Sequence, residues 1–413
     1  MKNDIIYFTL FPWENAYSSV SLSFTREFCK HNRVFYINPP YTAKDFITNR
    51  SDPQVKERAR HQIRGKMRYE SIPTFPDNVI AVHPPMTIPI NFLPPGKWYD
   101  QLYAYNNRII LNTIRQVIKD YQLKDFIYLN CFNPYYAGVL PPDFGQLVNI
   151  YQCIDDMYEE EYTAKHGAVV EEGILAQADI ALVTSRNLLK IKGKNNPNTH
   201  ILHNAVDMNI FKSALEQTFP KPQEIAHVKT KIIGFTGNLN EYRVNYELIK
   251  KVATYHKDKT VVLVGPLNSD DYKTHGLDQM DNVILTGGKN IRELPKFLQH
   301  FDVTMIPFYC NRLTASVYPL KINEYLSAGR PVVTSNFSED IRSFEEVIYV
   351  TKNDDEFVKT LDRAIAENDA SKVEARFAVA NSNTWEARVR EFWTIVESYL
   401  SQPNGAKATY HTY

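Results

Sequence analysis

Short apolar runs alternate with longer amphipathic stretches along the chain. The runs at 5–8, 34–37 and 126–129 are rich in β-branched and aromatic residues and are bounded by polar loops, which predicts buried strands. The stretch 99–121 repeats apolar positions at helical spacing, which predicts a long helix. Strand, loop, helix and strand in succession are typical of a doubly wound α/β domain.

The alternation is interrupted once and then starts again. Residues 212–230 show no clear periodicity and contain Pro and Lys, so they are predicted to form an interdomain linker. A chain of 413 residues is also too long for one ordinary core. We therefore predict two doubly wound α/β domains, 1–211 and 212–384, followed by a final helix at 385–401.

Composition narrows the class of protein. Hydrophobic residues make up 44% of the chain, which favours a packed core over disorder. Lys plus Arg and Asp plus Glu both number 47, so a broad nucleic-acid-binding surface is not expected. The four cysteines have no CxxC spacing, which argues against zinc or redox motifs and favours a reducing cytoplasm. No apolar stretch reaches membrane-spanning length, and the first apolar run is too short for a signal peptide.

One segment of the first domain is unusually basic. It allows two interpretations, a solvated mobile insertion or a surface that contacts an acceptor or the inner face of a membrane. Anionic lipid headgroups and lipid-linked phosphates both attract such clusters. The basic residues are Lys56, Arg58, Arg60, Arg64, Lys66 and Arg68.

The stretch 318–335 carries the most specific pattern. It predicts a short helix that ends at Gly329 in a left-handed conformation and a buried strand after it. Lys321 and Glu324 are three residues apart and share a helix face. Lys321 and the N–H groups of the helix start can attract a phosphate, and Glu324 can accept hydrogen bonds from neighbouring hydroxyls. The simpler alternative is an ordinary solvated ion pair.

The string Pro-Leu-Lys-Ile-Asn-Glu-Tyr-Leu-Ser-Ala-Gly-Arg-Pro-Val-Val resembles the donor-site signature of retaining group 1 (family 4) GT-B glycosyltransferases. The resemblance implies two Rossmann-like domains that face a central cleft, with the last helix crossing back to the first domain. It also implies that Glu324 binds the ribose of a nucleotide-diphosphate sugar and that Lys321 lies near the diphosphate. The family often has a second glutamate at the position of Ser316.

The same resemblance extends to the loop after the strand 231–236. The family shows Gly-Arg-Leu and a lysine four residues later, whereas this chain has Gly237-Asn238-Leu239 and then Arg243. An arginine can clamp a diphosphate with two hydrogen bonds, so Arg243 and Lys321 are expected to stabilise the leaving group. Further donor-binding residues are expected at the strand ends and around the signature: Leu320, Pro319, Ser316, Gly237, Asn238, Gly265 and Thr314.

Acceptor residues are expected at strand ends of the first domain. Asp155 and Asp156 follow the strand 147–151, where they can position an acceptor hydroxyl or cap the next helix. The other candidates are Trp13, Tyr17, His83 and Asn133, although a lone histidine at a strand end is more often structural.

The predicted function is transfer of a sugar from a nucleotide-diphosphate donor to a hydroxyl of a carbohydrate or lipid-linked acceptor, with retention, in bacterial polysaccharide or glycoconjugate synthesis. No Asp-x-Asp motif stands at a suitable site, so neither a metal nor another cofactor is expected. The alternatives are a GT-B nucleotide-sugar epimerase and a non-catalytic sugar-nucleotide binding protein. An NAD-dependent oxidoreductase is disfavoured because no G-x-G-x-x-G follows a strand. The predicted location is the cytoplasm, with peripheral membrane contact through 56–68.

Overall fold

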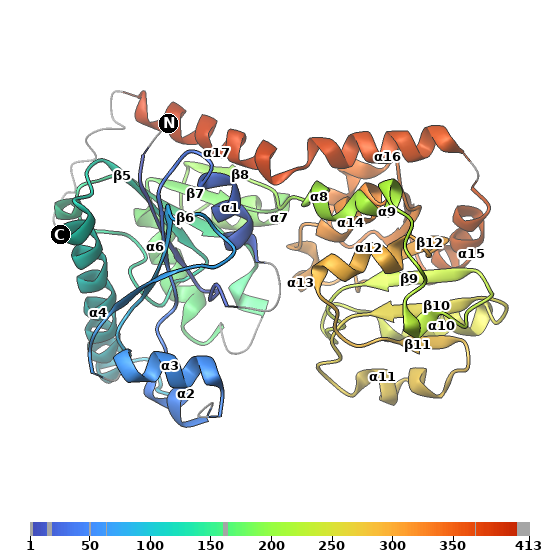
Figure 1. Ribbon diagram of the computed structural model, residues 1–413, viewed down its shortest axis with the longest axis horizontal. Coiled ribbons are helices and arrows are strands. Elements are labelled where there is room, and N and C mark those ends of the chain that lie inside the picture. The colour runs from blue at the N-terminus through green and yellow to red at the C-terminus, as the bar shows by residue number, and fades with distance from the viewer. Residues whose placement is uncertain are drawn as a thin grey trace. The chain divides into compact units, whose positions relative to one another are not determined.

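A computed structural model of the chain describes residues 3–14, 19–48, 51–62, 64–159, 164–367 and 369–402. The chain divides into two compact units (Figure 1). The first unit comprises 1–184, 188–202 and 389–413, and the second comprises 185–187 and 203–388.

The first unit is built around an eight-stranded sheet that is parallel except for its edge strand β3. In spatial order the strands are β3 (Arg68–Ser71), β4 (Val79–His83), β2 (Val34–Ile37), β1 (Ile5–Thr9), β5 (Phe126–Cys131), β6 (Gln146–Cys153), β7 (Ile180–Val183) and β8 (Thr199–Ile201). Adjacent β1 and β2 are in register with Ile6 opposite Phe35. The central strands are apolar on both faces, as expected for a parallel sheet covered on both sides.

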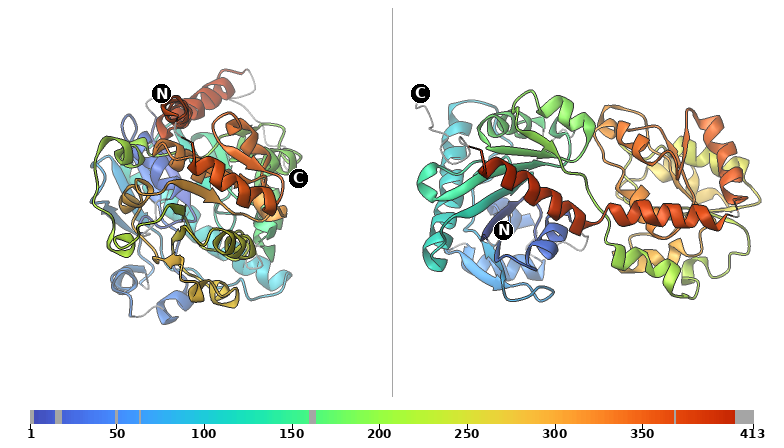
Figure 2. Two further views of the ribbon diagram at one scale, coloured as in Figure 1. Left: turned by 90° about the vertical axis from the view of Figure 1, so that its right-hand side faces the viewer. Right: turned by 90° about the horizontal axis from the view of Figure 1, so that it is seen from above.

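Helices cover both faces of this sheet (Figure 2). Ile110, Ile114 and Val117 of the long helix α4 pack with Ile6 and Phe35 on one face. On the other face Phe28 of α1 contacts Tyr7 and Phe392, edge to face. Among the described residues of this part of the chain, the helices are α1 (Val20–Phe28), α2 (Ala43–Thr48), α3 (Pro53–Gln62), α4 (Lys97–Tyr121), α6 (Gly167–Gln177) and α7 (Arg186–Lys192), with 3₁₀ helices η1 (Pro142–Phe144) and η2 (Met157–Glu159).

The second unit has a six-stranded, all-parallel sheet. Its spatial order is β11 (Val283–Leu285), β10 (Thr260–Val264), β9 (Ile232–Thr236), β12 (Val303–Ile306), β13 (Val332–Ser335) and β14 (Tyr349–Thr351). Two apolar clusters lie on the two faces of this sheet. Ile249 of α10 and Leu361 of α15 belong to one, and Phe297 of α12 and Leu326 of α14 belong to the other.

The helices of this unit vary in length, and several are single turns. They are α8 (Met208–Phe211), α9 (Ser213–Glu216), α10 (Tyr246–Tyr255), α11 (Asp271–Thr274), α12 (Leu294–Leu298), α13 (Arg312–Ala315), α14 (Leu320–Ser327), α15 (Asp354–Ile365) and α16 (Ala370–Ser382). Four 3₁₀ helices lie between them: η3 (Gln223–Ile225), η4 (Leu277–Gln279), η5 (Ile291–Glu293) and η6 (Glu339–Phe344). The last helix, α17 (Trp385–Leu400), begins in this unit, and from Val389 onward it belongs to the first.

One expectation about a connecting segment is corrected. Residues 212–230 are not a linker, because Ala214, Ile225 and Val228 are buried in the core of the second unit. The main segment of the second unit begins at His203. The basic segment forms α2, α3 and the edge strand β3, and its Lys56, Arg64 and Lys66 are exposed.

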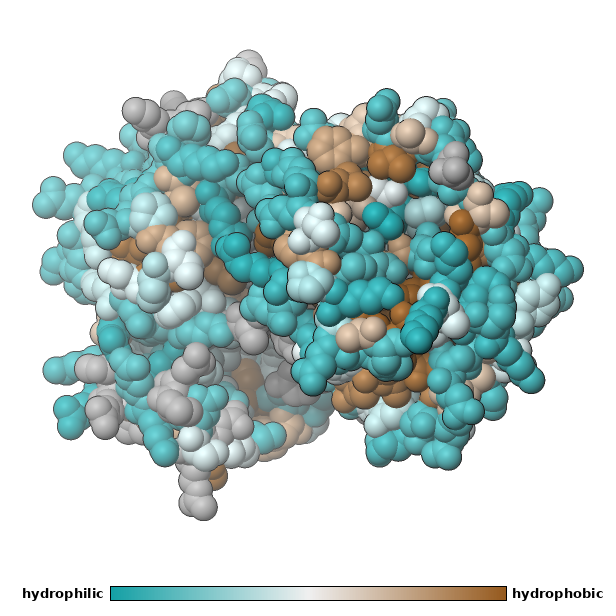
Figure 3. Space-filling model, turned by 45° about the vertical axis from the view of Figure 1, so that its right-hand side comes forward, coloured by the Kyte–Doolittle hydropathy of each residue, from teal (hydrophilic) through white to brown (hydrophobic). Residues whose placement is uncertain are grey.

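None of the described helices is both long and apolar enough to cross a bilayer. The face drawn in Figure 3 is largely hydrophilic, with small apolar areas between the charged and polar side chains.

Candidate donor and acceptor sites

The second sheet has a topological switch point between β9 and β12. The chain adds β10 and β11 on one side of β9, then returns to place β12, β13 and β14 on the other side. In open parallel sheets, ligands bind outside the carboxyl ends of the strands at such a point. The residues that follow β9, β10 and β12 are therefore the candidates for a binding site.

Two glycines bring backbone together at this edge. A Cβ atom on Gly265, which follows β10, would lie only 1.7 Å from the carbonyl oxygen of Gly237, which follows β9. A Cβ atom on Gly237 would lie 3.2 Å from Cε of Lys321. The strand ends and the start of α14 thus meet in a space that side chains on these glycines would fill.

The loops after β9 and β12 are joined by backbone hydrogen bonds. The N–H of Tyr309 donates to the carbonyl of Arg243 at 2.9 Å, and the N–H of Asn245 donates to Pro307 at 2.8 Å. Arg243 itself is half-buried in this loop. It lies in the loop that follows β9, beside the switch point.

Helix α14 is anchored by its apolar face and by one tyrosine. Ile322 and Leu326 lie in the core, and the buried hydroxyl of Tyr325 accepts a hydrogen bond from the N–H of Thr236 at 2.8 Å. Burial raises the pKa of Tyr325, which keeps the phenol protonated. The helix ends as predicted, with Gly329 in the left-handed region at φ +68°. Tyr325 therefore fixes the position of α14 relative to the end of β9.

Lys321 and Glu324 form an ion pair on the first turns of α14, with Nζ 2.8 Å from Oε2. The Glu324 side chain is 6% exposed and that of Lys321 is 25% exposed. The pair is therefore not the solvated surface pair of the simpler interpretation. It places one cation and one strong hydrogen-bond acceptor beside Gly237.

Two predicted donor-site side chains are already engaged inside the protein. The Thr314 hydroxyl caps α13 together with Asn311, and it donates to the carbonyl of Tyr309. The Ser316 hydroxyl accepts from the side-chain amide of Asn187 at 2.9 Å. Both residues are fully buried. A ligand contact by either would have to use its backbone, or these bonds would have to break.

The remaining donor candidates lie at the same edge. Pro319 stands at the N-cap of α14, and Leu320 is the first residue of the helix. Asn238 is exposed and its Oδ1 accepts from Asn268 at 3.0 Å, so the ends of β9 and β10 also touch through side chains.

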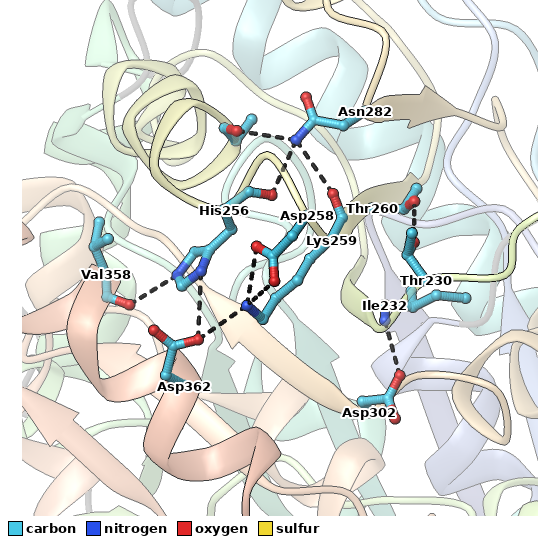
Figure 4. Close-up of polar contacts among 11 residues, drawn as sticks. Thr230, Ile232, His256, Asp258, Lys259, Thr260, Asn282, Asp302, Val358 and Asp362 are labelled. Carbon is cyan, nitrogen blue, oxygen red and sulfur yellow. Dashed lines mark hydrogen bonds and ion pairs between the residues drawn. The ribbon is translucent and has the colours of Figure 1, made fainter.

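The opposite edge of this sheet is occupied by a structural network (Figure 4). The amide of Asn282 donates to the carbonyls of Ala253, His256 and Lys259, while Lys259 pairs with Asp362 at 3.1 Å. These contacts tie α10 and α15 to the amino ends of the strands. Because the donors and acceptors satisfy one another, this edge is built for stability rather than binding.

In the first unit, a chain of hydrogen bonds connects the ends of β1, β2 and β4. The N–H of Trp13 donates to Oδ1 of Asn38 at 3.0 Å, and the amide of Asn38 donates to Nδ1 of His83 at 3.1 Å. Nε2 of His83 then donates to Glu70 at 2.8 Å. Burial and the nearby Arg58 and Arg68 lower the pKa of His83 to about 3, so the imidazole is neutral. His83 is therefore a positioning residue for the Trp13 loop.

Asn133 holds the loop after β5 in place. Its backbone N–H donates a hydrogen bond to Oδ1 of Asn130 at 3.0 Å. Its side-chain amide donates to the carbonyl of Thr9 at 3.2 Å. The side chain is fully buried. The structure gives Asn133 a role within the fold and no exposed surface for an acceptor.

The two adjacent aspartates after β6 differ in their surroundings. Asp156 is 3% exposed and lies 3.5 Å from Nζ of Lys192, which pairs with the buried Glu171 at 2.7 Å. Burial raises the pKa of Glu171. Asp155 is half-buried and precedes this network in the same loop. Of the two, Asp155 is the one whose position permits contact with an acceptor.

Tyr17 lies outside the described residues. Among the described residues, no group of three His, Cys, Asp or Glu side chains could hold a metal ion.

Sequence reasoning missed the contributions of Tyr325, Asn187 and Arg58. Arg58 was counted in a basic surface, yet it is 5% exposed and pairs with Glu14. No local signal marks either Arg58 or Asn187, because the partner of Arg58 is 44 residues away and that of Asn187 is 129 residues away.

Comparison with known proteins agrees with this geometry. Residues 230–367 match a family model described as glycosyl transferases group 1. The match contains β9 to α15, including the glycines at the strand ends and the Lys321–Glu324 pair.

One curated relative of this chain is "Putative teichuronic acid biosynthesis glycosyltransferase TuaH" of Bacillus subtilis (strain 168), 26% identical over 197 residues. The match covers 46% of this chain and spans about half (49%) of the length of that relative.

Solved structures share the fold over nearly the whole chain. Sucrose-phosphate synthase from Thermosynechococcus elongatus superposes with a TM-score of 0.64 at 13% identity, covering 96% of this chain and 99% of that one. Trehalose 6-phosphate synthase from Burkholderia multivorans superposes with a TM-score of 0.65 at 9% sequence identity, covering 96% of this chain and 99% of that one. HepE from Anabaena, solved with UDP and glucose, superposes with a TM-score of 0.61 at 13% sequence identity, covering 97% of this chain and 100% of that one. The predicted GT-B fold is thereby confirmed.

Proposed function

We propose that this protein is a group 1 glycosyltransferase that moves a sugar from a nucleotide-diphosphate donor to an acceptor hydroxyl, with retention of the anomeric configuration. The observation that carries the proposal is the buried Glu324 paired with Lys321 beside Gly237, at the switch point of a group 1 domain. Glu324 would accept hydrogen bonds from the ribose hydroxyls. Lys321 and Arg243 would neutralise charge on the leaving diphosphate.

The first unit would bind the acceptor. Trp13 and Asp155 lie at the carboxyl edge of its sheet, where Asp155 would orient the acceptor hydroxyl. The Bacillus relative is named for teichuronic acid biosynthesis. That name supports a role for this chain in bacterial polysaccharide or glycoconjugate synthesis, on a carbohydrate or lipid-linked acceptor. We further propose that the reaction needs neither a metal ion nor another cofactor.

The test is a panel of nucleotide-diphosphate sugars, first ranked by thermal shift and then assayed for nucleoside diphosphate release with oligosaccharide or lipid-linked acceptors. Proton NMR of the product would show the configuration of the new linkage. Activity that persists in EDTA would support independence of divalent metals. If no donor binds, or if soaked donor lies far from α14, the proposal is wrong.

A non-catalytic binding protein is the second candidate, and one observation favours it. Ser316 stands where the family carries a glutamate, and its hydroxyl is held by Asn187. Such a protein would bind a donor at Glu324 yet release no diphosphate. An epimerase would change the donor sugar without any acceptor, which the same NMR assay would detect.

Peripheral membrane contact through 56–68 also remains a proposal. Lys56, Arg64 and Lys66 are exposed, whereas Arg58 is buried and Arg68 pairs with Glu57 at 2.8 Å. Sedimentation with anionic vesicles, before and after neutralising the three exposed residues, tests it. Equal sedimentation of both proteins at low salt would contradict it.

A further inference from the structure

A cluster of buried polar atoms without partners lies at the carboxyl edge of the first sheet. Among the described residues, these atoms are Nε1 of Trp13, Oε2 of Glu14, Nε and Nη1 of Arg58, and Oε1 of Gln62. Buried polar groups are nearly always hydrogen-bonded, and exceptions gathered in one place call for an explanation. The structural network at the amino edge of the second sheet shows the contrast, because its groups bond to one another.

Residues at the ends of the strands hold one side of the cluster in place. Trp13, next to Glu14, is fixed through Asn38 and His83 to the ends of β2 and β4. Tyr36 donates to the carbonyl of Phe11 at 2.7 Å, which fixes the start of the same loop. The loop therefore presents Glu14 at the edge where ligands bind in open α/β sheets.

Helix α3 holds the cluster from the other side. Gln62 donates to the carbonyl of Pro84 at 2.8 Å and thereby ties the helix to the loop after β4. Arg58, one turn earlier on the same face of α3, is 5% exposed and points inward, with its guanidinium 4.7 Å from the centroid of the Tyr41 ring. One N–H of the guanidinium, at Nη2, bonds to Oε1 of Glu14.

Glu14 satisfies Arg58 only in part. A carboxylate can accept two parallel bonds from a guanidinium, yet here Oε2 of Glu14 and two nitrogens of Arg58 have no partner among the described residues. Removing a guanidinium from water is unfavourable unless its donors are paired. A second oxyanion at this place would supply the missing acceptors, with the Tyr41 ring stacking against the cation.

We propose that Arg58 forms an anion subsite of the first unit, in which a carboxylate or phosphate group on the sugar acceptor replaces or joins Glu14. The inference rests on the proposed function, because it takes the bound molecule to be the acceptor. Glu14 acts as the internal competitor that occupies the cation when the subsite is empty. The subsite selects acidic sugars over neutral ones, because only an anionic group can replace the Glu14 carboxylate as the counter-charge of the guanidinium.

The test uses the full chain and three probes at equal ionic strength: glucuronate, glucose 6-phosphate and glucose. Affinities are measured by thermal shift titration and by calorimetry, with no nucleotide present. At least one acidic sugar is expected to raise Tm, and glucose is not. Binding of glucuronate alone assigns a uronic acid, and binding of glucose 6-phosphate alone assigns a phosphorylated acceptor.

The variants separate this subsite from general surface charge. Arg58→Gln is expected to weaken binding of the acidic probe at least tenfold. Arg64 is an exposed arginine after the same helix, and Arg64→Gln is expected to leave the affinity unchanged. Glu14→Gln removes the competitor and is expected to tighten binding at least threefold. This gain distinguishes a competitor from a merely structural partner, and it does not depend on Arg58→Gln folding.

Equal binding of glucose, unchanged binding in Arg58→Gln, or no tightening in Glu14→Gln would overturn the inference. The outcome is independent of catalysis. If the acidic probe binds through Arg58 but no donor releases diphosphate, the proposed function fails while the subsite stands. If transfer occurs but neither acidic sugar binds, the subsite fails alone.

Discussion

Nζ of Lys321 lies 2.8 Å from Oε2 of Glu324, and Cε of the same lysine borders the space above Gly237. This arrangement gives two neighbouring charges opposite roles. Under the proposed function, the buried carboxylate would accept hydrogen bonds from the ribose hydroxyls, and the more exposed ammonium would face the diphosphate. The first two predictions separate these roles.

Glu324→Ala is expected to weaken donor nucleotide binding about 10- to 100-fold, because a charged acceptor of hydrogen bonds is lost. Calorimetry with the best nucleotide sugar from the panel measures the effect. Glu247→Ala, on the exposed first turn of α10, is the matched control and should bind like the wild type. Wild-type affinity in Glu324→Ala would exclude the ribose contact.

Lys321→Ala is expected to slow transfer about 100-fold while changing the donor Kd by less than about tenfold, since the cation matters most as charge develops on the leaving group. Steady-state kcat and a separate Kd measurement resolve the two effects. Lys273, which pairs with Asp270 at the same three-residue spacing on an exposed helix, provides the control variant Lys273→Ala. A weakened Kd with an unchanged kcat would point to ground-state binding instead.

Gly265→Ala is expected to destabilise the protein by about 3 kcal/mol or more, because the new Cβ would lie 1.7 Å from the Gly237 carbonyl and backbone would have to move. Urea unfolding measures the change. Gly173→Ala is the control: it lies in α6 with no atom within 4 Å of the new Cβ, and should stabilise by about 0.5–1 kcal/mol. Similar effects of both would refute the close approach.

The lowered pKa of the buried His83 leads us to predict that the stability of the protein depends on pH. Its pKa is about 3 in the folded protein and about 6.5 when unfolded, so between these values only the unfolded state gains the proton. Stability therefore falls as pH drops from about 6.5 toward 3, by up to about 1.4 kcal/mol per pH unit. Glu70, Arg58 and Arg68 face the imidazole, and none of them is altered in the variant.

His83→Gln should flatten this part of the stability curve, because the amide cannot gain a proton. Urea unfolding at pH 4 to 7 is the measurement, and His227→Gln, at an exposed histidine, is the control. A parallel loss of stability in His83→Gln and wild type would contradict the buried neutral imidazole.

Local pattern predicted much of this protein. Strands such as β1 and β10 are continuous apolar runs, and the signature at 318–335 gave α14, the left-handed Gly329 and β13 in the right order. These features depend on neighbours within one turn or one strand. The amphipathic period, the special freedom of glycine and the i, i+3 spacing of Lys321 and Glu324 are all written in the chain itself.

Only the tertiary structure decided which polar side chains face a ligand and which hold the fold. Arg58 looked like part of a solvated basic run until α3 was seen to turn it onto Glu14, 44 residues away. Thr314, Asn133 and His83 looked like ligand contacts, yet their partners lie inside the protein. Burial and pairing across long sequence separations set these roles, and neither has a local signal because each depends on how distant segments pack.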